Sequence, residues 1–301
     1  MGAPSRPSMP TAPPSATVTK AGSAGRRPFS RLAERVATHG VLIFFLVLFI
    51  GPLVWIFLLA LKTRQEFAAN PLGLPMDPQW ANFTTAWDQG RFSVYLPNTF
   101  LYAIAIVLGV ATFACLCGYA FAKLRFPGRD LLFGLFLLGL TLPFLSIMIP
   151  IFHIARDLHI LGTRWGFILP AVGLGLPFSI FLMRAFFRAI PDELGEAARV
   201  DGSGEFGVFF RVMLPLAWPG LATVAVFEFL NAWSAYLMPL VLVQREELRP
   251  VALALPLFQS RYSSELQLIA AATIITIVPP LIVYLLLQRR FVEGVTAGAL
   301  K

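Results

Sequence analysis

Six long apolar runs constrain what this chain can fold into more than any other feature. They occupy residues 41–61, 96–122, 131–152, 165–187, 216–243 and 266–287. A bilayer core about 30 Å thick is crossed by roughly 20 apolar residues in a helix, so each run is long enough. The apolar residues are continuous rather than alternating, which favours helices over a transmembrane β-barrel. The sequence therefore predicts an all-α membrane protein with six transmembrane helices.

Prolines inside several of these runs indicate helices that are bent. They are Pro143, Pro150, Pro170, Pro177, Pro219, Pro239, Pro279 and Pro280. A proline removes a backbone donor and kinks a helix, and neighbouring helices can satisfy the freed carbonyl in a membrane. Ordinary kinked packing and a bundle with movable helices are both compatible with this pattern.

The distribution of positive charge gives the orientation. If the N-terminus is cytoplasmic, the inside segments hold 16 Lys and Arg and the outside segments hold eight. This is the bias that the positive-inside rule predicts, so both termini are expected in the cytoplasm. Because the net charge of +8 has this topological cause, it gives no reason to expect nucleic-acid binding.

The remaining composition offers little to an enzyme. The cysteines, Cys115 and Cys117, are two residues apart in the second run, so on a helix they point to different faces and cannot easily pair. With three histidines in the chain, no metal-ligand cluster is expected. We expect a disordered N-terminal tail over residues 1–40, one transmembrane domain over 41–291 and a C-terminal tail over 292–301, with no room for a soluble catalytic domain.

A polar stretch between the fourth and fifth runs, EAARVDGSGEFGVFFRVMLPL (196–216), interrupts the apolar sequence. It predicts a short helix over 193–201, a break at Gly202, and a second helix from Ser203. That second helix would carry Phe206, Phe209, Phe210 and Met213 on one face, before Leu214-Pro215 turns the chain back to the membrane. Small residues on a flat helix surface favour docking against another protein, and an interfacial re-entry with phenylalanines among lipid headgroups is the alternative.

This stretch resembles a pattern found in ABC importer permeases. The matching positions are Glu196, Ala197, Ala198, Gly202, Val212, Leu214 and Pro215. The surrounding sequence is most similar to the carbohydrate-uptake group, in particular to the smaller maltose-type permease subunit. Residues 119–133, 176–198 and 288–301 resemble the same group, so the likeness covers roughly residues 40–301.

The resemblance implies a multi-pass protein of the bacterial inner membrane, without enzymatic activity or a cofactor of its own. Its implied partners are a second permease subunit, two ATPase subunits that bind the ATP, and an extracytoplasmic solute-binding protein. Segment 192–215 would be a cytoplasmic coupling helix pair in which Glu196 pairs with a basic group of the ATPase. The implied ATPase-coupling residues are Glu196, Ala197, Ala198, Arg199, Asp201, Gly202, Phe206, Leu214 and Pro215. No GxxxxGK[ST] motif occurs in the chain, as expected where the ATPase is a separate subunit.

The fifth run is the best place to look for substrate contacts. Within EFLNAWSAYL (228–237) lie Glu228, Asn231, Trp233 and Tyr236, and polar groups inside a membrane tend to face the bundle interior. Asn98 is a further candidate, and interhelical hydrogen bonding without a ligand is the alternative for each residue. Related permeases often carry Asn-Glu after this tryptophan, where this chain has Ser-Ala. The acid at 228 therefore leaves room for an amino-bearing solute.

The predicted function is that of a permease forming half of the translocation pathway for a sugar or oligosaccharide. An ABC importer permease for another small solute, such as an amino-bearing sugar, a polyol, an amino acid or a peptide, is the alternative. A gradient-driven secondary transporter would need internal repeats and several coupling acids in its spans. ATP-dependent uptake that requires a binding protein would separate these classes.

Overall fold

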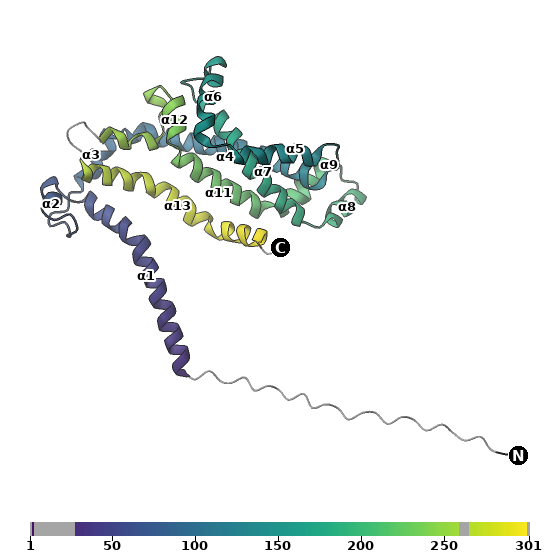
Figure 1. Cartoon of the computed structure of the whole chain (residues 1–301), viewed down its shortest axis with the longest axis horizontal. Coiled ribbons are helices and arrows are strands. Elements are labelled where there is room, and N and C mark those ends of the chain that lie inside the picture. Colours follow the sequence, from purple (N-terminus) through teal and green to yellow (C-terminus); the bar gives the residue numbers. More distant parts are fainter. Residues whose placement is uncertain (1, 3–27, 259–264, 300–301) are drawn as a thin grey trace. The chain divides into compact units, whose positions relative to one another are not determined.

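The computed structural model describes Gly2, residues 28–258 and residues 265–299. Every regular element within these residues is a helix (Figure 1). The chain divides into two units, Met1–Pro52 and Leu53–Lys301. The predicted disordered tail covers residues 1–40, and most of it lies outside the described residues. Of the predicted C-terminal tail, residues 292–301, only the last two residues lie outside them.

The first unit ends inside helix α1 (Pro28–Ala60), which begins earlier than the apolar run at Val41. Its apolar stretch, Val36–Ala60, is long enough to cross a membrane; residues 36–50 of it are exposed, whereas Leu59 and Ala60 at its end are buried. Phe45 and Phe49 stack on each other with ring centroids 6.2 Å apart. A helix that is apolar all round and has no protein cover has the surface that lipid requires.

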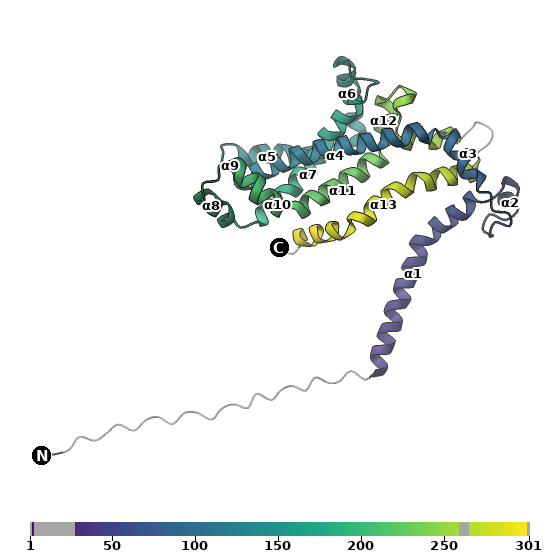
Figure 2. The same cartoon turned by 180° about the vertical axis from the view of Figure 1, so that it is seen from behind.

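Four helices form the centre of the second unit: α4 (Phe92–Lys123), α7 (Trp165–Ala189), α11 (Trp218–Ser234) and α13 (Leu266–Ala299). Helix α4 packs against α7 and α11, and α11 packs against α13, as both views show (Figures 1 and 2). Small residues permit this packing. A Cβ added at Gly118 of α4 would lie 2.7 Å from the Met183 Cβ of α7, so the two backbones approach too closely for any larger residue.

Of the described helices, four are long and apolar enough to cross a membrane, and there are six spans if each of two bent pairs counts as one. The predicted all-α membrane fold is confirmed. A continuous third span over 131–152 is wrong, because α5 (Arg129–Leu138) with η1 (Gly139–Thr141) meets α6 (Phe144–Asp157) at 105°. The backbone is extended at Leu142 and Pro143, since a proline disfavours helical geometry in the residue before it.

The predicted fifth span, 216–243, is also interrupted. Helix α11 ends at Ser234, Ala235 is extended (φ −60°, ψ 119°), and the short helix α12 (Leu237–Leu242) follows. Pro239 lies four residues after Ala235, so its ring would clash with the Ala235 carbonyl in a continuous helix. Helix α12 instead packs against α6 and α7, and Figure 1 shows α6 and α12 projecting together from one side of the bundle.

The outer connections are compact. Helix α2 (Arg64–Ala69) begins with a capping box between Thr63 and Glu66, and α3 (Ala81–Gln89) follows it in the same connection. The buried Lys62 donates hydrogen bonds to two backbone carbonyls, those of Asn70 and Pro71, at 2.7 and 3.2 Å. Three short 3₁₀ turns follow α12: η3 (Glu246–Leu248), η4 (Val251–Leu253) and η5 (Leu255–Phe258).

Candidate functional site

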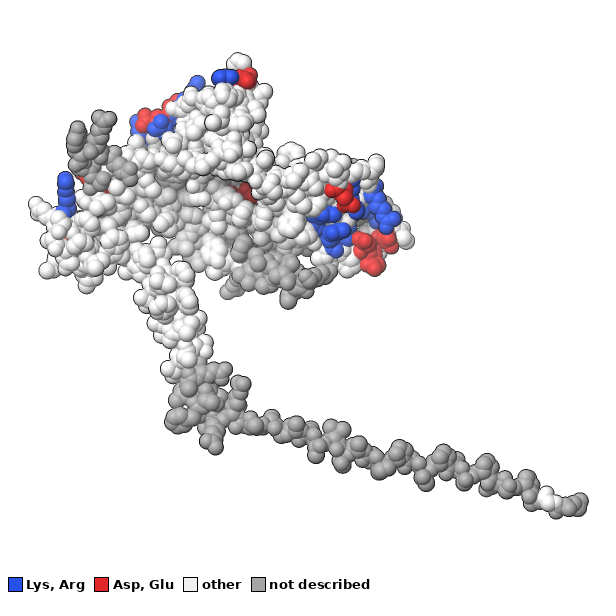
Figure 3. Space-filling model, viewed as in Figure 1, with Lys and Arg blue, Asp and Glu red and all other residues white. Residues whose placement is uncertain are grey.

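The polar connection between α7 and α11 forms one end of the second unit (Figures 1 and 2). It consists of α8 (Asp192–Val200), α9 (Glu205–Val208), the π-helix η2 (Phe209–Met213) and α10 (Leu214–Leu216). We call this segment, residues 192–216, the α8–α10 loop. Charged side chains gather at this end, whereas the middle of the unit is almost free of them (Figure 3).

Helix α8 is held to the bundle at its start. The Asp192 carboxylate pairs with the ammonium of Lys123, the last residue of α4. The hydrogen bond from Lys123 lowers the pKa of Asp192 below its ordinary value. Gly195 is the only buried residue of α8, and a Cβ there would lie 2.9 Å from Met213 Cε of η2. Helix α8 therefore rests on η2 through a glycine, and the rest of its surface is available.

The turn between α8 and α9 is rigid for a loop of its length. Gly202 has a φ of +87°, a left-handed conformation that glycine adopts without strain. The Arg199 guanidinium reaches over this turn and donates two hydrogen bonds to the Glu205 carboxylate, at 2.8 and 3.2 Å. These bonds raise the pKa of Arg199 above its ordinary value. A bidentate pair of this kind fixes direction as well as distance, so the two short helices keep one relative orientation.

The exposed face of the α8–α10 loop is partly apolar. Val200 is 87% exposed and Phe206 is 81% exposed, and Glu196 and Ala197 beside them are exposed too. Ala198 is partly buried and packs against the core, so Ala197 rather than Ala198 is the small residue available for contact. Large apolar side chains on a polar, charge-bearing surface indicate a protein contact.

The predicted single face of Phe206, Phe209, Phe210 and Met213 is wrong. Phe209 and Met213 are buried, whereas Phe206 and Phe210 are exposed. The cause is the π-helix, in which the Leu214 nitrogen donates to the Phe209 carbonyl five residues earlier. The proline that follows Leu214 has no N–H to continue α-helical bonding. The wider turn shifts the register of the face, and π-bulges of this kind are frequent at functional sites.

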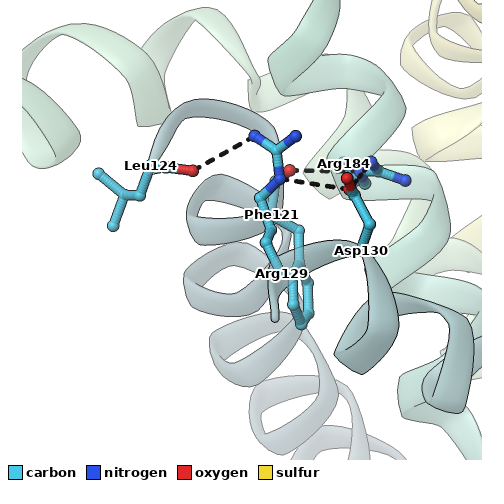
Figure 4. A network of polar contacts seen from close by, with 5 residues as sticks. All are labelled: Phe121, Leu124, Arg129, Asp130 and Arg184. Atoms are coloured by element: carbon cyan, nitrogen blue, oxygen red, sulfur yellow. Dashed lines mark hydrogen bonds and ion pairs between the residues drawn. The ribbon is translucent and has the colours of Figure 1, made fainter. Parts of the chain in front are cut away.

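A polar network fixes the ends of α4, α5 and α7 beside the loop (Figure 4). The Arg184 guanidinium donates to the Phe121 carbonyl at 3.3 Å and to Asp130 at 3.4 Å. The Arg129 guanidinium pairs with the same carboxylate at 3.3 Å and donates to the Leu124 carbonyl at 3.4 Å. Asp130 therefore joins α5 to α7, and the two arginines bind the carbonyls at the end of α4, so the three helices are connected beside the loop.

A cavity of about 450 Å³ lies inside the bundle. Its walls come from α4, α6, α7, α11 and α12 and are mostly apolar; they include Phe144, Phe167 and Gly175. Glu228 of α11 also lines it and is only 3% exposed. The Ser179 hydroxyl of α7 donates to Glu228 Oε1 at 2.9 Å. A Cβ at Gly175 would lie 2.7 Å from Glu228 Oε2, so this glycine makes room for the carboxylate.

The structure separates the five residues predicted to line a substrate pathway. Glu228, Asn231 and Tyr236 line the cavity together. Trp233 and Asn98 do not line it. The Trp233 indole donates to a backbone carbonyl of α13 at 3.1 Å, and the Asn98 amide donates to the Glu247 and Arg249 carbonyls at 2.8 and 3.2 Å. These two side chains tie helices and outer turns together instead.

Sequence reasoning missed Gly175 and Ser179, which shape the surroundings of Glu228. The signal was weak, because Gly175 is one of three glycines and Ser179 the one serine in the long apolar run of 165–187. Neither residue is unusual in a membrane helix, where small residues and hydroxyls serve packing. Their relation to Glu228 depends on how α7 packs against α11, which the spacing within one helix does not report.

A helical bundle of this kind, with an exposed loop at one end and a cavity between its helices, has a counterpart in a known family. The sequence profile described as "Binding-protein-dependent transport system inner membrane component" matches residues 111–296. The chain belongs to this family. It is an ABC importer permease, a transport component of the inner membrane with several membrane-spanning helices, and not an enzyme.

Relatives of this permease match along most of the chain. The diacetylchitobiose uptake system permease proteins NgcG and DasC of Streptomyces coelicolor are 33% and 36% identical to it. NgcG matches over 88% of each chain, and DasC over 85% of this chain and 94% of its own. A crystal structure of a bacterial ABC transporter involved in the import of the acidic polysaccharide alginate contains a similar chain, with a TM-score of 0.74 and 26% identity. That match covers 87% of this chain and 98% of the other. An importer of this type also contains a second permease chain, ATPase subunits and a solute-binding protein, which are the partners of this permease.

Proposed function

We propose that this chain forms half of the translocation pathway for a saccharide and that the α8–α10 loop couples it to ATPase subunits. The observation that carries the coupling role is the exposure of Val200 and Phe206. These two apolar side chains lie on a charged loop, where contact with water is unfavourable for the side chains and contact with lipid is unfavourable for the charges around them. A cleft on another protein would bury them, and the small side chain of Ala197 beside them lets that protein approach the backbone closely.

The saccharide cargo is favoured by the relatives whose names record their substrates. Besides the diacetylchitobiose permeases, a trehalose transport system permease of Mycobacterium tuberculosis is 34% identical over 252 residues. The cavity agrees with such a cargo. Aromatic side chains such as Phe144, Phe167 and Tyr236 line it together with a few polar groups, which is the usual make-up of a small-molecule site.

The orientation follows from the charges. We place the α8 end in the cytoplasm, because basic residues favour that side. Those at this end include Lys123, which pairs with Asp192 of α8, Arg188 in the last turn of α7, Arg125 between α4 and α5, and Arg129 at the start of α5. Both termini then lie in the cytoplasm too. ATP is bound by the partner subunits, whose closure draws the loops of the two permeases together and opens the cavity outward.

The test compares two identical substitutions at opposite ends of the second unit. Ala197→Trp places a large side chain on the exposed face of α8, and Ala69→Trp places one on the exposed end of α2. We expect co-purification of the ATPase subunits with the permease to be lost for Ala197→Trp and kept for Ala69→Trp. Both variants should insert in the membrane and, when produced without the ATPase subunits, elute alike in gel filtration.

Uptake gives the second measurement. Proteoliposomes with the complete importer, its binding protein and internal ATP should accumulate labelled disaccharide, and the Ala197→Trp importer should not. Retention of the ATPases and of uptake by Ala197→Trp would refute the coupling role. Uptake that needs no ATP would identify a gradient-driven carrier instead.

A further inference from the structure

The carboxylate of Glu228 has no charged partner in the cavity. No lysine, arginine or histidine is among the residues that line it, and the one hydrogen bond to this carboxylate comes from the Ser179 hydroxyl. Oε2 accepts none from the part of the chain that the structure describes. Figure 3 shows a small acidic surface in the otherwise uncharged middle of the bundle. An acid in this position is costly and, in membrane proteins, usually functional.

Packing alone does not require an acid here. A glutamine has nearly the same shape, and its carbonyl oxygen would accept the Ser179 hydrogen bond equally well. The glycine at 175 accommodates a planar group of either kind. Glutamate differs from glutamine at this position in that it can carry a negative charge, so the ability to ionise is the property that needs a cause.

Two neighbouring polar groups in the cavity are also without internal partners. Within the described residues, the Asn231 amide and the Tyr236 hydroxyl make no hydrogen bond, and both residues are exposed to the cavity side. Together with Glu228 Oε2 they form a set of polar groups converging on an apolar space. Such a set binds a ligand that supplies hydrogen-bond donors.

We propose that Glu228 makes this cavity selective by charge, so that it accepts neutral and amino-bearing saccharides and rejects those that carry a carboxylate or a sulfonate. The proposal rests on the proposed function, because the cavity must belong to the saccharide pathway. In surroundings of low dielectric, one negative charge within several ångströms attracts an ammonium group and repels an anion. Neutral sugars are held by the donors of their hydroxyl groups instead.

The test measures the charge preference of the cavity without any substrate. In an assembled importer whose permease carries Cys115→Ala and Cys117→Ala, a single cysteine is introduced as Asn231→Cys. The rate of its reaction is measured with the cationic reagent aminoethyl methanethiosulfonate and with the anionic reagent sulfonatoethyl methanethiosulfonate. The cation-to-anion rate ratio reports the local charge. The matched control is Ala69→Cys on the exposed end of α2.

We expect the ratio at position 231 to exceed the ratio at position 69 by at least roughly tenfold. Adding Glu228→Gln should bring the two ratios together and leave the ratio at position 69 unchanged. Ser179→Ala, which removes the hydrogen bond but keeps the charge, should preserve the preference. The comparison of positions 231 and 69 needs no change at Glu228, so it holds even where the glutamine variant assembles poorly.

Equal ratios at the two positions, or a high ratio at 231 that survives Glu228→Gln, would overturn the proposal. Failure of the proposed function has a different signature. The wild-type importer with its binding protein and ATP would then take up no saccharide, whatever the cysteine ratios are. Where uptake is present, cellobiose should compete with it in the wild-type importer. Cellobiouronic acid, the matched sugar with a carboxylate, should not compete.

Discussion

Gly118 is where the packing of α4 against α7 can be tested most sharply. A Cβ there would lie 2.7 Å from Met183 Cβ and 3.0 Å from the Arg184 backbone nitrogen. Carbon atoms in ordinary contact are about 3.5–4.0 Å apart. Because the obstructing atoms are a backbone atom and the first side-chain carbon of a fully buried methionine, no rotation relieves the clash. Gly118→Ala therefore has to push the two helices apart by about 1 Å.

Overpacking of this kind costs about 1–3 kcal/mol. At roughly 2–4 °C per kcal/mol, this clash should lower the apparent Tm by about 2–12 °C. The matched control is Gly173→Ala on α7, where an added Cβ meets nothing within 4 Å. Both changes gain similar helix propensity, about 1 kcal/mol, so the difference between the two variants isolates the clash.

The assay is thermal unfolding of the two purified variants in the same detergent and at the same scan rate, since unfolding of membrane proteins is often irreversible. Gly118→Ala should unfold at a lower temperature than both wild type and Gly173→Ala. Equal unfolding temperatures for the two alanine variants would show that α4 and α7 are not in close contact at Gly118, and the helix packing described above would be wrong.

Three further changes test the loop and the bundle. Gly202→Ala puts a side chain at a φ of +87°, which costs roughly 1 kcal/mol. Trypsin should therefore cleave the loop about five times faster. Gly204→Ala, at a negative φ, should leave the cleavage rate unchanged. Trp233→Phe loses one hydrogen bond and should cost about 1 kcal/mol in thermal unfolding. The Lys123 hydrogen bond lowers the pKa of Asp192, so this pair stabilises the fold above about pH 4, the ordinary aspartate pKa. The stability difference between wild type and Asp192→Asn should therefore hold at neutral pH and vanish on acidification through the lowered pKa; a loss already between about pH 7 and 6 would contradict it.

Much of the fold follows from local rules. The apolar runs locate α1, α4, α7 and α13, the four helices that are long and apolar enough to cross a membrane, because the length needed to cross a bilayer depends on the chain alone. The turn at Gly202 and the helix before it were predicted for the same reason: a glycine with positive φ after a short helix is a local preference. Residues that act within one turn of helix are the ones that a single sequence can locate.

The wrong predictions concern the breaks in the spans and the residues that line the cavity, because both depend on how a helix packs against its neighbours. Ten prolines occur in the apolar runs. The spans with Pro143 and Pro239 are broken, whereas Pro97, Pro170 and Pro177 remain inside continuous helices. Which bend forms depends on whether other helices can satisfy the freed carbonyl. The same holds for the cavity. Trp233 and Asn98 carry polar groups within spans, as Glu228 does. Their hydrogen-bond partners, on α13 and in the turns after α12, are far away in sequence.

The same helices connect the α8–α10 loop to the cavity. Helices α7 and α11 flank the α8–α10 loop in sequence, and the same two helices carry Ser179 and Glu228 on the cavity wall. A displacement of the loop therefore reaches the cavity through continuous helix, with the π-helix η2 as the adaptable joint. Helices α6 and α12, separated from their neighbours by Pro143 and Pro239, contribute the cavity residues Phe144 and Leu237. The cavity wall thus combines two long helices that continue from the α8–α10 loop with two shorter helices set off by the breaks, and Glu228 lies on one of the long helices.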